Sequence, residues 1–301
     1  MLTTLEFERS SADQVLVERD GISLCLLVNR RAQTLRVVDF RAGFSPAKRS
    51  SAATVAKSEG IRRLYILVER DEAPSWVRLG FQREGTIPGF YKRSDAHVLG
   101  LVLPAGADFE NEQSGVHRLG ERAPASSASF ERTVQRARRF LSAHGGERPS
   151  VRLHALGETE TRKAVSAALS SGRAMTVFEP FGRDVTRWYF ACTARGGYSL
   201  TVSVETQPCF NNAFIELLTA PRSEKEAVFT VAALERLGQV LAEREVIGAF
   251  SLSPAENVHL AAAFVGNGFR RTGQLREQLL IDGRRADALL WSRKLAQPTD
   301  S

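Results

Sequence analysis

Residues 249–295 read AFSLSPAENVHLAAAFVGNGFRRTGQLREQLLIDGRRADALLWSRKL, and the expected fold follows from this stretch. Its first five residues alternate between apolar and polar side chains, which is typical of a strand. Apolar residues then recur at helical spacing as far as Gly266, and the following Asn267-Gly268 pair predicts the end of that helix. The stretch is therefore expected to begin with a strand that leads into a helix.

A hairpin is expected to complete the stretch. A second strand begins at Phe269, the Asp282-Gly283 pair is typical of a two-residue hairpin turn, and residues 286–291 predict the return strand. The predicted order is therefore strand, helix and hairpin.

The same order is predicted in the first third of the chain. Residues 80–85, GFQREG, match residues 268–273, GFRRTG, at four of six positions. In this register Trp76 stands where Phe264 stands in the later stretch. Because a helix, a strand, a second helix and a hairpin follow one another in both places, an internal duplication is predicted.

Length and composition favour a globular protein with two ordinary domains. The chain has 301 residues, of which 43% are hydrophobic and 25% charged. No apolar run reaches the length of a membrane helix, and residues 1–11 lack the apolar region of a signal peptide, so a cytoplasmic location is expected. The three cysteines, Cys25, Cys192 and Cys209, lack metal-ligand spacing; they are interpreted as buried thiols, and no metal site is expected.

The net charge of +7 favours anionic partners, either nucleic acid or a nucleotide cofactor. The paired arginines are scattered along the chain and are not interleaved with aromatic residues. Nucleic-acid binding is therefore the least favoured function, and no membrane partner is expected.

Three regions are expected: a first domain over residues 1–104, a linker with a helix over 105–150, and a second domain over 151–297. Residues 105–129 are rich in Gly, Ala, Ser and charge, as linkers are. Residues 130–143 predict a basic amphipathic helix. Such a helix could bind a membrane or nucleic acid, but a bridge between the two domains is favoured.

These features resemble the GNAT acetyltransferase family. That family has Asn, usually Tyr seven residues later, and then Gly-Phe; here the positions hold Asn257, Phe264 and Gly268-Phe269. Residues 87–91, IPGFY, are similar to a segment of the β-lysine N-acetyltransferases in this family. The resemblance implies an α+β fold with tandem GNAT-like domains, each with a mixed, mostly antiparallel sheet flanked by helices.

The resemblance also implies an activity, the transfer of an acetyl group from acetyl-CoA to a small amine such as a β-lysine-like diamine. Glu216 stands where many GNAT enzymes place the general base. The implied cofactor-binding residues are Leu217, Leu218, Thr219, Asn257 and Phe264. Phe264 replaces the tyrosine that usually acts as the general acid, and it cannot donate a proton. The sequence names no substitute, although Tyr198 or Cys209 could fold nearby. His259 is interpreted as a capping or surface residue, and a homo-oligomer is compatible with the sequence.

The cofactor loop departs from the family pattern of Arg or Gln, two residues, Gly, one residue, then Gly or Ala. The matching positions hold Glu224, Ala227 and Phe229, where an acid would repel phosphate and a phenyl ring takes space. Phe229 either fills the pyrophosphate space or turns into the core. The alternative function is therefore a non-catalytic tandem GNAT-like protein that binds a ligand or partner and has a decayed cofactor loop. In the first domain the loop before Lys48 could hold an anion, but structural support is favoured.

Overall fold

The computed structural model describes residues 12–19, 21–104, 127–146, 148–183, 185–207 and 210–295. The elements of the N-terminal unit are β1 (Ala12–Arg19), β2 (Ile22–Asn29), β3 (Thr34–Asp39), α1 (Pro46–Ser58), β4 (Arg63–Val68), α2 (Ala73–Arg78), β5 (Gln82–Ile87) and β6 (Ala96–Val102). Those of the C-terminal unit are α3 (Ser127–Ala143), β7 (Val151–Ala155), α4 (Glu158–Ser170), β8 (Thr186–Ala194), β9 (Ser199–Gln207), β10 (Asn212–Leu217), α5 (Glu224–Glu243), β11 (Gly248–Pro254), α6 (Val258–Gly266), β12 (Arg270–Ile281) and β13 (Arg284–Lys294). The linker expected over 105–129 lies almost wholly outside the described residues.

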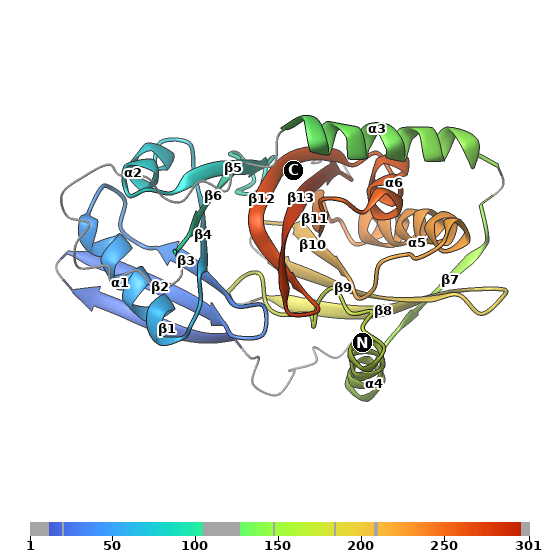
Figure 1. Cartoon of the computed structure of the whole chain (residues 1–301), viewed down its shortest axis with the longest axis horizontal. Coiled ribbons are helices and arrows are strands. Elements are labelled where there is room, and N and C mark those ends of the chain that lie inside the picture. Colours follow the sequence, from blue (N-terminus) through green and yellow to red (C-terminus); the bar gives the residue numbers. More distant parts are fainter. Residues whose placement is uncertain are drawn as a thin grey trace.

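The described strands form one mixed, mostly antiparallel sheet that runs through both units (Figure 1). Its strand order is β1-β2-β3-β4-β6-β5-β12-β13-β11-β10-β9-β8-β7. The expected α+β fold class is confirmed, and so are the strand, helix and hairpin predicted from residues 249–295, which are β11, α6, β12 and β13. Strand β1 was not expected. Leu16 is an apolar residue on its exposed side, 64% exposed at the edge of the sheet, so the segment does not alternate between apolar and polar residues.

The two units repeat the same arrangement of elements. The series β3-α1-β4-α2-β5-β6 has the same order as β10-α5-β11-α6-β12-β13. In each series the first two strands pair in parallel, and the second pairs antiparallel with the last. Trp76 meets Phe81 edge to face at 5.0 Å, and Phe264 meets Phe269 in the same way at 5.3 Å. The register inferred from the two Gly-Phe pairs therefore describes equivalent packing positions.

The units join through their equivalent edges, where β5 pairs with β12 only at Gly85 and Gly273. A Cβ atom added to Gly273 would lie 2.5 Å from the Cα of Gly85, so the join needs glycine at this position. Beside these glycines, the buried guanidinium of Arg63 forms a bidentate ion pair with Glu84 and donates a hydrogen bond to Gln278 at 2.9 Å. The junction is therefore close-packed and internally paired.

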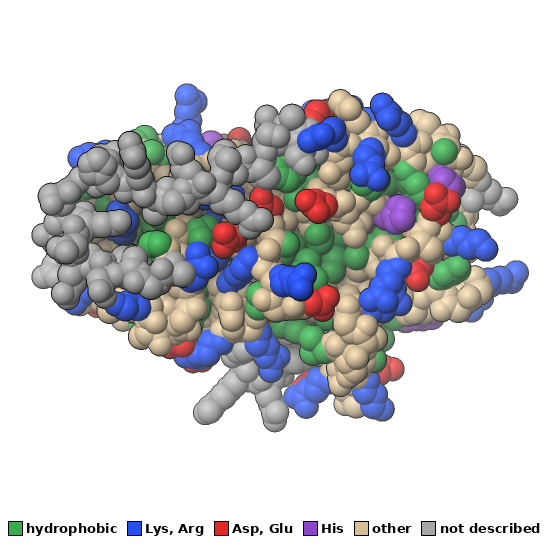
Figure 2. Space-filling model, viewed as in Figure 1, with side chains coloured by type: hydrophobic (Ala, Val, Ile, Leu, Met, Phe, Trp, Pro, Cys, Tyr) green, Lys and Arg blue, Asp and Glu red, His purple; other side chains and the backbone are tan. Residues whose placement is uncertain are grey.

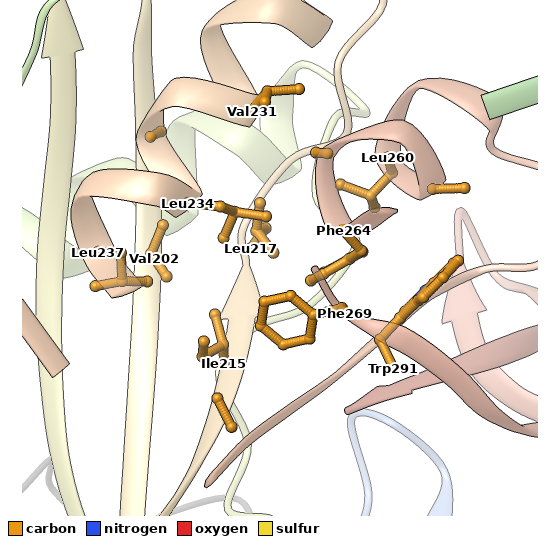
Figure 3. Close-up of a cluster of buried hydrophobic side chains, with 14 of the residues drawn as sticks. Val202, Ile215, Leu217, Val231, Leu234, Leu237, Leu260, Phe264, Phe269 and Trp291 are labelled. Carbon is orange, nitrogen blue, oxygen red and sulfur yellow. The ribbon is translucent and has the colours of Figure 1, made fainter. Parts of the chain in front are cut away.

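Helices α3, α5 and α6 lie together on one side of the C-terminal part of the sheet (Figure 1). Beneath them, Phe264 stacks on Trp291 at 5.5 Å in a core that also contains Phe269 and Leu237 (Figure 3). Helix α3 includes the predicted amphipathic helix and packs on α6. Among the described residues, no helix is both long and apolar enough to cross a membrane.

Candidate functional site

A cavity of about 430 Å³ lies between the two units. The N-terminal unit contributes the turn between β2 and β3 and one side chain of β4. The C-terminal unit contributes the segment after α4 and parts of β10, β11 and β12. The polar residues that line it are Asn29, Arg31, Thr34, Tyr65, Thr176, Glu179, Glu216, Gln278 and Asp282, and its aromatic walls include Phe181 and Phe214.

The turn between β2 and β3 is fixed against the C-terminal unit by side chains from both units. Arg285 on β13 donates to the carbonyl of Ala32 at 3.0 Å. Arg36 lies over the ring of Phe181 at 4.9 Å and donates to the carbonyl of the same residue. The N-terminal unit thus forms one wall of the cavity.

Glu216 is a carboxylate whose surroundings disfavour its charged form. Its Oε1 accepts a hydrogen bond from the Thr176 hydroxyl at 2.8 Å, whereas its Oε2 has no solvent contact and no partner within the described ranges. Burial raises the pKa of Glu216 to about 7, and the Arg187 guanidinium and the Thr176 hydroxyl oppose that rise. A carboxyl group with this pKa can take and release a proton at neutral pH.

The nearby Arg187 forms its ion pair with Glu205 and not with Glu216. Arg187 pairs with Glu205, which also accepts from the backbone amides of Phe181 at 2.9 Å and Gly182 at 2.6 Å. Glu205 is thus satisfied by several donors, while Glu216 is not paired directly. Burial raises the pKa of Tyr65 to about 12, so this tyrosine presents a protonated hydroxyl at neutral pH.

The cavity reaches a gap between two parallel strands. Strands β10 and β11 pair from Asn212 with Gly248 as far as Ile215 with Ser251, and their pairing ends there. Leu217 on β10 and Pro254 on β11 both border the cavity. The cavity therefore reaches the parts of β10 and β11 that lie beyond their last paired residues.

The three consecutive residues that were expected to bind the cofactor differ in their relation to the cavity. Leu217 borders the cavity, although its side chain lies in the core beneath α5 (Figure 3). Leu218 donates to Thr201 at 2.9 Å and accepts from Met175 at 2.8 Å, and Thr219 forms a bridge with Ala174. Only Leu217 among the three stands at the cavity.

Asn257 and Phe264 lie away from the cavity. Asn257 caps the start of α6, where its Oδ1 accepts from the amide of Leu260 at 2.8 Å, and it borders a second hollow on the surface. Phe264 is fully buried in the core and borders neither space. The structure therefore does not bring Phe264 to the carboxylate.

Side chains of the protein itself already bond to the backbone amides at the start of α5, where an anion would otherwise bind. The Ser223 hydroxyl accepts from the amide of Glu226 at 3.2 Å. The Glu226 carboxylate in turn accepts from the amide of Arg222 at 2.9 Å and pairs with Arg173 at 3.0 Å. A carboxylate thus already stands where an anion would approach this helix. Glu224 is turned towards His144, 3.3 Å away.

The remaining loop positions belong to the core. Ala227 is fully buried, and Phe229 lies in the same cluster as Ala233 and Leu237, which settles its orientation between the two alternatives. Tyr198 stacks on Phe229 at 5.9 Å and lines neither the cavity beside Glu216 nor the second hollow. Cys209 lies outside the described residues.

In the N-terminal unit, Lys48 fills the corresponding place at the start of α1. Its buried ammonium donates to Asp39 at 2.5 Å and to the carbonyls of Arg41 and Gly43, the latter at 2.7 Å. These bonds tie the loop to the helix, as structural support requires.

Sequence reasoning missed Tyr65 and Thr176 as residues of the cavity. Tyr65 lies in an apolar run that correctly predicts a buried strand, and Thr176 lies in a segment without periodicity. The aromatic residue within the apolar run is the one signal that sequence could have offered.

The sequence matches no protein-family model and no curated protein. Among solved structures, it is similar to spermidine N-acetyltransferase from Vibrio cholerae in complex with CoA and spermine, with 16% identity and a TM-score of 0.39, over 48% of this chain and 95% of that chain. A dodecameric structure of the Vibrio cholerae enzyme gives 17% identity and a TM-score of 0.40, over 48% and 94%. A protein assigned as a phosphinothricin N-acetyltransferase gives 16% and 0.39, over 49% and 100%.

Proposed function

We propose that this protein is a GNAT-like N-acyltransferase that transfers an acetyl group from acetyl-CoA to a small amine held in the central cavity. The observation that carries the proposal is Glu216, a carboxylate at the diverging strands with one oxygen held by Thr176 and the other unpartnered among the described residues. A group with a pKa of about 7 in this position suits the removal of a proton from an attacking amine.

The residues present fit the acyl end of acetyl-CoA but not a diphosphate held at the start of α5. The cavity extends to Leu217, where the pairing of β10 and β11 has ended, so the narrow acyl-bearing end of the cofactor could reach Glu216. At the start of α5, however, the amide of Glu226 is bonded to Ser223, and the Glu226 carboxylate would repel phosphate. When bound, acetyl-CoA supplies a reactive acetyl thioester.

The chain's own residues would then position the amine and move its proton. Thr176 holds Oε1 of Glu216 and thereby orients the carboxylate, so that Oε2 is left to accept the proton. The protonated hydroxyl of Tyr65 and the ring of Phe181 line the same cavity and would orient the acceptor. Fixing the amine beside its base removes part of the entropic barrier to the reaction.

For the acceptor we propose a β-lysine-like diamine, in line with the family resemblance. Glu179 and Asp282 line the cavity in addition to Glu216. One ammonium group can approach Glu216 while the other pairs with one of these acids. Arg31, 3.9 Å from Glu179, can pair with a carboxylate of the acceptor.

The second candidate is a non-catalytic tandem GNAT-like protein that binds its ligand in the same cavity. The closed start of α5 favours it, because the phosphate site of the family is occupied by Glu226. The burial of Phe264 away from the cavity favours it too, because no tyrosine stands in the family's position.

Calorimetric titration with coenzyme A, followed by an acetyl-transfer assay on a panel of diamines, separates the two functions. An enzyme should bind coenzyme A and acetylate at least one diamine, with a rate that rises with pH as Glu216 loses its proton near pH 7. Binding of a diamine without binding of coenzyme A would establish the non-catalytic function and overturn the proposal.

A further inference from the structure

A second hollow, of about 600 Å³, opens on the surface at the start of α6. Its lining residues are Arg136, Arg139 and Phe140 of α3 together with Glu256, Asn257, Val258 and His259. Figure 2 shows Lys and Arg side chains gathered over α3, with histidine side chains beside them. The arrangement combines a concave surface with positive charge.

The end of α3 brings this hollow next to the starts of both α5 and α6. The ring of Phe140 lies 5.3 Å from that of His259 on α6 and 4.3 Å from that of His144. His144 in turn lies 3.3 Å from Glu224 at the start of α5. The hollow is therefore beside the helix end that Glu226 closes.

The charge around the hollow favours an anion. Arg136 and Arg139 are exposed, and within the described part of the chain neither makes an ion pair. The helix dipole of α6 adds partial positive charge at its start. Glu256 is the acid of the lining, so the two guanidinium groups outnumber it.

Residues that border the hollow are close in sequence to residues that border the central cavity. Pro254 borders the cavity and Asn257 borders the hollow. Because three residues span at most about 11 Å, Pro254 and Asn257 are no further apart than an extended ligand can span.

We infer that this hollow binds the phosphate groups of the co-substrate, in place of the closed start of α5. The inference rests on the proposed function, because it assigns the phosphate end of the same molecule whose acyl end reaches Glu216. Arg136 and Arg139 pair with the phosphates. The oxygen of Asn257 caps α6, while its amide nitrogen has no acceptor among the described residues and is available to a ligand. The linking helix has thus taken over a role that the α5 loop no longer performs.

The test compares coenzyme A with pantetheine, which lacks the phosphates, by calorimetry on the full chain. Arg136→Gln and Arg139→Gln should each weaken coenzyme A binding about tenfold, the value for the loss of one charge-assisted contact. The double variant should weaken it further and reduce the dependence of Kd on salt. Pantetheine binding should not change. Arg138→Gln is the control, since this exposed arginine of α3 does not line the hollow.

The outcomes separate this inference from the proposed function. If the unmodified protein binds coenzyme A and the double variant binds it equally well, the phosphates lie elsewhere and only the inference fails. If the unmodified protein binds neither coenzyme A nor pantetheine, both the inference and the proposed acyltransferase fail. An equal loss in Arg138→Gln would show a general charge effect and would also overturn the inference.

Discussion

Replacing Glu216 by glutamine should make the protein more stable at alkaline pH while abolishing acetyl transfer. Burial raises the pKa of Glu216 from 4.5 to about 7, so the folded state keeps a proton that the unfolded chain releases. Stability is therefore lost as pH rises through the window between these two values. Glutamine has the same shape, stays neutral and can still accept the hydrogen bond of Thr176.

The size of the effect follows from the shift in pKa. At 1.36 kcal/mol per unit, a rise from 4.5 to about 7 corresponds to roughly 3 kcal/mol in the free energy of unfolding. Most of this change falls between pH 5 and pH 8. Glu216→Gln should therefore gain roughly 2.5 kcal/mol over the unmodified protein at pH 8, relative to their difference at pH 5.

Urea denaturation at pH 5 and pH 8, with the transfer rate measured on the same preparations, is the assay. Glu243→Gln is the matched control, because the Glu243 side chain is 68% exposed and far less affected by burial. A stability difference between Glu216→Gln and the unmodified protein that stays constant with pH would refute the reasoning about burial. A full transfer rate in Glu216→Gln would place the base elsewhere.

Three further substitutions test the architecture by thermal or urea denaturation. Gly273→Ala places a Cβ 2.5 Å from the Cα of Gly85 and should cost about 1–3 kcal/mol, whereas Gly146→Ala, with nothing within 4 Å of its Cβ, should cost little; equal effects would contradict the close junction. Lys48→Met removes the cation that pairs with the buried carboxylate of Asp39 and with two carbonyls, and it should cost about 3–5 kcal/mol; an unchanged midpoint would show that the loop does not need this cation. Phe229→Ala should cost about 3–5 kcal/mol because the ring is buried in the core, and a stable variant with stronger coenzyme A binding would instead place the ring in the ligand's path.

Sequence by itself determined the repeated strand, helix and hairpin. These elements follow from local periodicity and from glycines at helix ends, which act over a few residues. The two Gly-Phe pairs set a register that holds in space, because Trp76 and Phe264 meet their phenylalanines in the same geometry. The position of Glu216 on a strand was likewise predictable, because Asn212–Leu217 is a short apolar run with one acid.

Tertiary structure alone decided the cavity, the junction and the closure of the start of α5. Tyr65, Thr176 and Glu216 are far apart in the chain, and only the joining of the two units places them around one space. The pKa of Glu216 depends on how much solvent the surrounding segments exclude, which no local pattern encodes. The closure of α5 likewise needed Arg173, about fifty residues away in sequence, to hold the Glu226 carboxylate at the helix start. Burial and pairing are properties of distance in space, whereas periodicity reports only what is near along the chain.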